Sequence, residues 1–161
     1  MDKKSLLKRL NWFFSLELNQ VDLYKAQSKA FAEEYAGLVF ERLSLIEQGH
    51  VENIGAKIKE MGANPTVIGD VISPLIGHTA GKAIGKMSLA EVLKINTMIE
   101  QKAMKDYKTL INELKESYYG SKELIKLLQQ NFIDENLHTE WFKTKLSELQ
   151  TGEFSLQPLK R

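Results

Sequence analysis

The stretch Asp134-Glu135-Asn136-Leu137-His138 determines our interpretation of the fold. Glu135 and His138 are three residues apart, so a helix places them one turn apart on the same face. Apart from Asn131, the rest of that face is apolar, as in an amphipathic helix, with Leu124, Leu128, Phe142 and Leu149. A carboxylate and an imidazole therefore occupy positions where leucine is usual. A buried carboxylate needs a partner, because burying an isolated charge is costly.

The same pair occurs once more, as Glu47-Gln48-Gly49-His50, between apolar residues that include Phe40, Leu43, Ile54 and Ile58. A single Glu-x-x-His match is weak evidence, since it often arises by chance. The chain has only 3 histidines, however, and two of them carry a glutamate at the same offset. Two buried pairs of this kind indicate a metal site.

Two further apolar stripes carry one glutamate each. Glu17 follows Leu10 and Phe13, and Glu100 follows Leu93. Two single glutamates and two Glu-x-x-His pairs are the ligand set of carboxylate-bridged two-metal four-helix bundles. The predicted metal ligands are Glu17, Glu47, His50, Glu100, Glu135 and His138.

The spacing of these residues predicts where the chain reverses. Antiparallel helices that hold Glu17 and Glu47 at one level must turn near residue 32, in Phe31-Ala32-Glu33-Glu34. Glu100 and Glu135 likewise place a turn in Ser117-Tyr118-Tyr119-Gly120, which carries a turn signal. No glycine or proline marks residues 31–34, so the first hairpin rests on spacing alone.

The halves of the chain repeat each other in spacing. Glu47 and Glu135 are 88 residues apart, as are His50 and His138, whereas Glu17 and Glu100 are 83 apart. A duplicated helix pair would give this pattern.

The predicted fold is all-α, a ferritin-like antiparallel four-helix bundle over residues 1–152 in one domain. The helix pairs span 3–61 and 88–150, and Ser88-Leu89-Ala90-Glu91 is a capping box that starts the third helix. Ser121 caps the fourth. The crossover, 62–87, is rich in glycine and apolar residues, and we expect a short apolar helix in it. A loosely ordered tail, 153–161, follows. His78, in the crossover, has no glutamate three residues before it and is not counted as a ligand.

Composition narrows the function classes. The chain has 161 residues, 43% hydrophobic and 27% charged, and a net charge of +1, so no strong field attracts nucleic acid. It has no cysteine, which excludes disulfides, thiolate chemistry and iron–sulfur or rubredoxin-type ligation. We expect no secretory signal and no membrane-spanning helix. The predicted location is the cytoplasm, with peripheral contact at the inner face of the membrane as an open alternative.

The donor set predicts the chemistry of the site. Carboxylate and imidazole ligands without sulfur suit two iron ions, with manganese as an alternative. Open coordination positions on such ions bind oxygen or peroxide. Asp134 is placed to accept the outer ring N–H of a ligand histidine on a neighbouring helix. Tyr24 and Tyr107 each lie seven residues beyond a single glutamate, close enough to hydrogen-bond to ligands or relay electrons.

From about Leu10 to Leu149 the chain resembles the ferritin-like diiron proteins, and among them the demethoxyubiquinone hydroxylases of ubiquinone synthesis. The motifs that carry the resemblance are Glu17 followed by Tyr24 and Gln27, Glu47-x-x-His50, Asn64-Pro65-Thr66, Glu100 followed by Tyr107, and Asp134-Glu135-x-x-His138. The resemblance implies a diiron site that activates oxygen and hydroxylates a quinone ring. It also implies that the connector touches the membrane that holds the lipid substrate.

The chain departs from that family at two positions. Asp22 stands two residues before Tyr24, where an arginine is usual, and Asp106 directly precedes Tyr107, where a histidine is usual. Both changes reverse or remove a positive charge. They leave the predicted ligands intact and put the quinone substrate and its reductant in doubt. The connector is also less apolar than expected, since it contains Asp70 and Lys82.

Several functions fit the sequence. The first is an oxygen-dependent diiron monooxygenase or oxidase of the quinone-hydroxylase type. The alternatives are a rubrerythrin-like peroxidase with a separate electron donor, an iron-handling protein like bacterioferritin, and a non-enzymatic bundle. The expected partners are oxygen or peroxide, a quinone-like small molecule, an electron donor and a membrane surface met by residues 67–85. No nucleic acid is expected, and both a monomer and an oligomer are compatible with the sequence.

Overall fold

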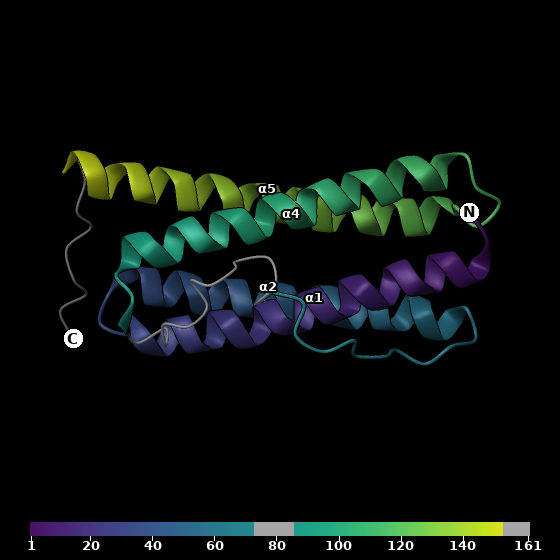
Figure 1. Ribbon diagram of the computed structural model, residues 1–161, viewed down its shortest axis with the longest axis horizontal. Coiled ribbons are helices and arrows are strands. Elements are labelled where there is room, and N and C mark those ends of the chain that lie inside the picture. Colours follow the sequence, from purple (N-terminus) through teal and green to yellow (C-terminus); the bar gives the residue numbers. More distant parts are fainter. Residues whose placement is uncertain (73–85, 153–161) are drawn as a thin grey trace.

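The computed structural model describes residues 1–72 and 86–152. It contains four long helices and, within those ranges, no strand: α1 Lys3–Ala30, α2 Tyr35–Glu60, α4 Leu89–Lys115 and α5 Lys122–Thr151. Figure 1 shows two antiparallel hairpins, α1 with α2 and α4 with α5, lying side by side. Helices α2 and α4 run in the same direction, so the end of α2 and the start of α4 lie at opposite ends of the bundle. The predicted all-α four-helix bundle is confirmed.

The crossover is described only in part. Residues 63–72 contain no helix. The short apolar helix expected in the crossover, His78 and the tail 153–161 fall on residues 73–85 and 153–161, outside the described ranges. Among the described helices, none combines the length and the apolar character that crossing a bilayer requires.

Local sequence signals set where α4 and α5 begin. The Ser88 hydroxyl accepts a hydrogen bond from the Glu91 N–H, and the Glu91 side chain accepts one from the Ser88 N–H, which completes the predicted capping box. The Ser121 hydroxyl accepts the Leu124 N–H at 3.1 Å and caps α5, as predicted. These bonds satisfy backbone donors that the first helical turn leaves unpaired.

Both hairpin turns fall where the ligand spacing predicts them. The first comprises residues 31–34, and the second lies between Lys115 and Lys122. The first turn requires a glycine even though residues 31–34 contain none. That glycine is Gly37, inside α2, where a side chain would collide with the Phe31 carbonyl oxygen. Gly120 has the same role in the second turn, against the Leu114 carbonyl oxygen.

The core consists of two apolar clusters separated by a polar layer. The Leu10 cluster is built from residues such as Leu6, Leu10, Phe13, Ile58 and Leu114. The Phe40 cluster, toward the other end of each helix, is built from residues such as Tyr24, Phe31, Phe40, Leu93 and Phe142. In chain order the predicted ligands of α1, α2 and α5 lie between the two clusters, and on α4 Glu100 directly follows Ile99, where the Leu10 cluster begins. Apolar packing at both ends therefore keeps water away from the polar layer.

The described part of the crossover is bound to the outer face of α1. Three polar side chains of α1, spaced four residues apart, accept backbone N–H groups of the segment 66–71. The bonds are Thr66 N–H to Asn11 Oδ1 at 2.6 Å, Ile68 N–H to Ser15 Oγ at 2.8 Å and Val71 N–H to Asn19 Oδ1 at 2.8 Å. This side-chain ladder gives an extended stretch without helix or sheet the partners that its backbone needs.

Candidate metal centre

All six predicted ligands meet in the middle of the bundle. Helix α1 contributes Glu17, α2 contributes Glu47 and His50, α4 contributes Glu100, and α5 contributes Glu135 and His138. The four glutamates are 0% exposed and the two histidines 4%. Each residue lies on the inner stripe of its helix, so the amphipathic pattern that builds the core also aims these side chains inward.

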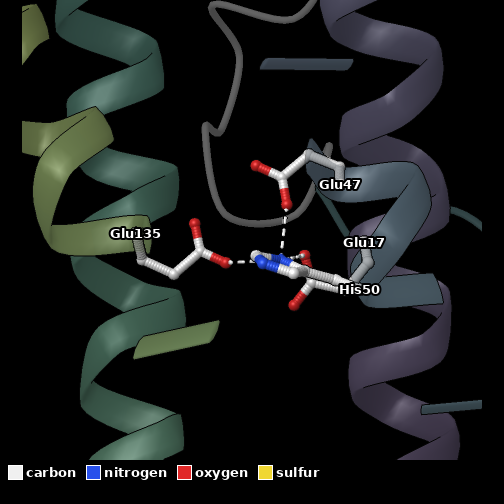
Figure 2. A group of neighbouring side chains, drawn as sticks. All are labelled: Glu17, Glu47, His50 and Glu135. Atoms are coloured by element: carbon white, nitrogen blue, oxygen red, sulfur yellow. Dashed lines mark ion pairs between the residues drawn. The ribbon is translucent and has the colours of Figure 1, made fainter. Parts of the chain in front are cut away.

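The six residues form two overlapping groups. One contains Glu17, Glu47, His50 and Glu135, and the other contains Glu47, Glu100, Glu135 and His138. Within each group one ligand atom per residue lies within 4.8 Å of all the others. Figure 2 shows the carboxylates of the first group around the ring of His50, with Glu135 reaching across from the opposite hairpin. Glu47 and Glu135 belong to both groups, which is the arrangement of carboxylates that bridge two ions.

The two oxygens of each shared carboxylate divide between the two histidines. Oε2 of Glu47 lies 2.9 Å from Nδ1 of His50, and its Oε1 lies 3.2 Å from Nδ1 of His138. For Glu135 the corresponding distances are 3.5 Å from Oε1 to His50 and 3.4 Å from Oε2 to His138. Adjacent ligands around an octahedral ion with bonds of about 2.1 Å lie about 3.0 Å apart. The distances around each histidine are close to this value. The atoms around His50 are therefore spaced to hold one ion, and those around His138 to hold a second.

The hydrogen bonding of the site supports the fit of metal ions. Within the described residues, several buried atoms that face this centre have no hydrogen-bond partner. They are Oε2 of Glu17, both carboxylate oxygens of Glu47 and of Glu135, and Nδ1 of both histidines. Buried polar atoms rarely stay unpaired in a folded protein. So many of them around one centre fit a site for cations, and the combination of carboxylate oxygen with imidazole nitrogen suits iron or manganese.

Protons compensate the negative charge of the metal-free site. Burial, reinforced by the negative charge of Glu135, raises the pKa of Glu17 well above its usual value and that of Glu100 to about 8. Burial lowers the pKa of His138, but the close carboxylates of Glu100, Glu135 and Glu47 outweigh it and raise the pKa to about 12. The metal-free site therefore holds protons at neutral pH that bound cations would displace.

The outer ring nitrogen of His50 is held by Asp134. His50 Nε2 lies 3.1 Å from Asp134 Oδ2, the contact that the sequence predicts between neighbouring helices. Hydrogen bonding to His50 lowers the pKa of Asp134, so Asp134 accepts as a carboxylate. The bond fixes the proton of His50 on Nε2 and leaves Nδ1 facing the other ligands.

Both predicted tyrosines donate a hydrogen bond to a predicted ligand of the opposite hairpin. The Tyr24 hydroxyl on α1 donates to Oε1 of Glu100, and the Tyr107 hydroxyl on α4 donates to Oε1 of Glu17. Burial, followed by the charge of the bonded glutamate, raises the pKa of both tyrosines well above its usual value. Both hydroxyls therefore remain donors across the physiological pH range.

Three amide contacts near the centre were not predicted. The Gln20 side chain donates to Oε2 of Glu100 at 2.9 Å, and Asn131 donates to the Tyr107 hydroxyl at 3.0 Å. Gln27 and Asn96 exchange two hydrogen bonds, at 2.9 and 2.8 Å. In the sequence these amides stand within apolar stripes, which indicates that their side chains are buried. The stripes do not identify the partners of these side chains on other helices.

A surface pocket of about 370 Å³ between α2 and α5 opens onto His50. Asp134 lines it together with polar residues such as Asn53 and Gln130, and Gly49 stands beside His50. A side chain at Gly49 would meet nothing within 4 Å. The pocket brings solvent to the outer edge of the site on the histidine side.

The two residues that depart from the family pattern lie on the outside of the bundle. Asp22 is exposed, and Asp106 is partly exposed and ion-paired with Lys102 on the same helix. The Lys102 ammonium also lies 4.8 Å from the centre of the Trp12 ring on α1. The negative charge of Asp106 is thus compensated next to Tyr107 without contacting a predicted ligand.

Comparison with known proteins gives two results, while no curated protein sequence matches the chain. Residues 17–158 match the family described as ubiquinone biosynthesis protein COQ7. An X-ray structure of Desulfovibrio desulfuricans bacterioferritin, which presents the diiron site of that protein in different catalytic states, has a TM-score of 0.75 to this structure. The two chains are 19% identical over 92% of this chain and 82% of that one. The bundle thus has the ferritin-like fold, and the chain belongs to the ubiquinone biosynthesis protein COQ7 family, in agreement with its resemblance to the demethoxyubiquinone hydroxylases.

Proposed function

We propose that the protein is a diiron oxidoreductase that activates oxygen and hydroxylates a quinone-like ring. The observation that carries the proposal is the pair of overlapping ligand groups that share Glu47 and Glu135. Two iron ions held there would supply the redox chemistry for oxygen activation. With four carboxylates opposite two divalent cations, the loaded site is close to neutral, which makes its burial feasible.

Each residue of the centre has a distinct proposed role. Glu47 and Glu135 would be shared by the two ions, Glu17 and Glu100 would each serve one ion, and His50 and His138 would each offer Nδ1. Asp134 keeps His50 in the required tautomer. Tyr24 and Tyr107 fix the carboxylates of Glu100 and Glu17 by hydrogen bonds from the opposite hairpin.

The reaction needs a separate electron donor. Hydroxylating a ring carbon with O₂ inserts one oxygen atom into the C–H bond and reduces the other to water, which consumes two electrons and two protons. The chain has no cysteine to hold a further iron–sulfur or rubredoxin-type centre. The electrons would therefore come from a small reductant or from another protein.

The first test is the iron content of protein purified without oxygen, followed by optical spectra after adding oxygen and then hydrogen peroxide. We expect about two irons per chain and fast oxidation by oxygen. Two irons that react with peroxide and only slowly with oxygen would replace the oxygenase by a peroxidase. Failure to bind iron even after reconstitution would reject the centre.

Single variants test the shared carboxylates. Glu47→Ala or Glu135→Ala should reduce the iron content to one ion or fewer and abolish the reaction with oxygen. Glu41→Ala is the control, because Glu41 is an exposed residue of α2. A shared-carboxylate variant that still binds two irons with unchanged affinity would remove that residue from the ligand set.

The quinone substrate is tested at Asp22 and Asp106. If the family's quinone site is retained, the double change Asp22→Arg and Asp106→His should tighten the binding of a short-chain quinone, measured by quenching of tryptophan fluorescence. Unchanged binding would favour a different substrate, while the iron content reports separately on the metal centre.

Membrane contact is a further part of the proposal. Val67 and Ile68 are 51% and 54% exposed on the described part of the crossover, and adjacent exposed apolar residues can insert into a lipid interface. Val67→Asp with Ile68→Asp should reduce co-sedimentation with lipid vesicles. If the double variant and the unmodified protein sediment equally with the vesicles, membrane contact through Val67 and Ile68 is rejected.

A further inference from the structure

The two halves of the metal centre are related by the internal repeat but differ in their hydrogen bonds. The His50 half contains Glu17 and His50, the His138 half contains Glu100 and His138, and both use Glu47 and Glu135. A perfect repeat would give both halves the same surroundings and two equal metal positions. The surroundings differ at the histidine and at the single glutamate.

The histidines differ in the partner of the outer ring nitrogen. His50 Nε2 lies 3.1 Å from Asp134 Oδ2, whereas His138 Nε2 is buried and has no hydrogen-bond partner among the described residues. The repeat explains the difference: Asp134 directly precedes Glu135, and the residue that directly precedes Glu47 is Ile46. A carboxylate on the outer nitrogen orients a ligand histidine and increases its basicity. Among residues 1–72 and 86–152, such a carboxylate supports the His50 half alone.

The single glutamates differ in how many oxygens are already engaged. Glu17 accepts a hydrogen bond at Oε1 from Tyr107, and its Oε2 has no partner and lies 3.5 Å from Nδ1 of His50. Glu100 accepts at both oxygens, from Tyr24 at Oε1 and from Gln20 at Oε2. The repeat accounts for this too, since the residue 83 positions after Gln20 is Ala103, which has no donor.

We infer that the two metal positions are unequal, and that the His50 half binds a divalent cation first and more tightly than the His138 half. This inference rests on the proposed metal centre. In the His50 half a cation meets an oxygen without a hydrogen-bond partner and a pre-oriented imidazole. In the His138 half it meets a carboxylate engaged at both oxygens and an imidazole whose outer nitrogen has no carboxylate partner within the described residues.

Single-histidine variants isolate the two positions. In the unmodified protein the first ion repels the second, so two unequal steps alone would not identify which position fills first. His138→Ala leaves the His50 half intact, and His50→Ala leaves the His138 half intact. Metal-free samples of each are titrated with Co²⁺ without oxygen, followed by visible absorption and calorimetry. We expect one Co²⁺ per chain in both, bound at least about tenfold more tightly by His138→Ala, the lower end of the effect of such outer partners.

A second change tests the cause. Asp134→Asn added to His138→Ala should weaken Co²⁺ binding, whereas the same change added to His50→Ala should leave it unaltered because the partner of Asp134 is already gone. Far-UV circular dichroism of each variant verifies that the helices are retained. A general loss of structure would weaken both backgrounds equally and would contradict the assigned role of Asp134.

The outcomes separate the inference from the proposed function. Equal affinities in the two single-histidine variants, or tighter binding by His50→Ala, would overturn the inequality while leaving a two-metal centre in place. If the unmodified protein binds no Co²⁺, the centre and the inequality both fail. Tight binding by His138→Ala that Asp134→Asn does not weaken would overturn the contribution of Asp134.

Discussion

The Tyr107 hydroxyl on α4 donates a hydrogen bond to the Glu17 carboxylate on α1, and this bond joins the two hairpins at the level of the metal centre. Tyr24 and Glu100 make the same connection in the opposite direction. The bonds of Gln20 to Glu100 and of Gln27 with Asn96 are equally buried between the hairpins, so the tyrosine bonds contribute with them to the register of one hairpin against the other. The bonds that align the ligands thus also hold the bundle together.

Tyr107→Phe should destabilise the metal-free protein by about 1–3 kcal/mol. The phenylalanine keeps the ring that stacks on Phe13 at 4.0 Å between centroids, but Glu17 loses a donor and the Asn131 amide loses an acceptor. The measurement is the free energy of unfolding in urea. Tyr35→Phe on the surface is the control, with an expected change within about 0.5 kcal/mol. Equal effects of the two changes would show that the buried hydroxyl contributes nothing measurable.

The reciprocal amide pair of Gln27 and Asn96 gives a prediction by double-mutant cycle. Gln27→Leu or Asn96→Leu alone leaves one buried amide without a partner and should cost about 1–3 kcal/mol of unfolding free energy. The double variant removes both polar groups and should be more stable than the sum of the single effects implies. Strict additivity in urea unfolding would mean that the two amides do not depend on each other.

The metal dependence of stability should increase with pH. Unfolded glutamate and histidine release their protons near pH 4.5 and 6.5, whereas the folded metal-free protein keeps those of Glu100 and His138 up to pKa values of about 8 and about 12. Between these limits the folded state binds more protons than the unfolded state, so the metal-free protein loses stability as the pH rises. Metal binding displaces the same protons and therefore becomes stronger.

The measurement is Tm in Mn²⁺ and in chelator at about pH 6 and about pH 8. The difference between the two Tm values should be larger at the higher pH. The lowered pKa values of Glu47 and Glu135 do not alter this sign, because those groups titrate below the tested range. A difference that stays constant or shrinks as the pH rises would contradict the protonated metal-free site.

The sequence was sufficient to single out the six residues that the structure brings together, because each of them interrupts an apolar stripe with a chemically unusual residue. Their spacing also located both turns, although the glycine that permits the first, Gly37, lies inside α2 and was not recognised as a turn signal. The roles of Gln20 and Asn131 were missed, because a stripe shows that a side chain is buried but not which helix it meets.

The attachment of the crossover to α1 was also not predictable. Asn11, Ser15 and Asn19 lie on the outer face of α1 and cannot be distinguished in sequence from an ordinary solvated helix surface. Their partners are backbone N–H groups of a segment without periodicity, and such contacts leave no pattern in the sequence. Helical periodicity predicts which face of a helix is buried in the bundle. It does not predict whether a loop covers the other face.

These contacts lead to a prediction about the crossover. Asn11→Ala with Asn19→Ala removes the acceptors for the N–H groups of Thr66 and Val71. A typical hydrogen bond contributes about 1 kcal/mol, so hydrogen exchange at these two amides should accelerate about fivefold. Exchange in the helices should not change, since no backbone bond of α1 or α2 is lost. Lys25→Ala, on the exposed face of α1, is the control. Unaltered exchange at Thr66 and Val71 would mean that contacts other than this ladder hold the crossover on α1.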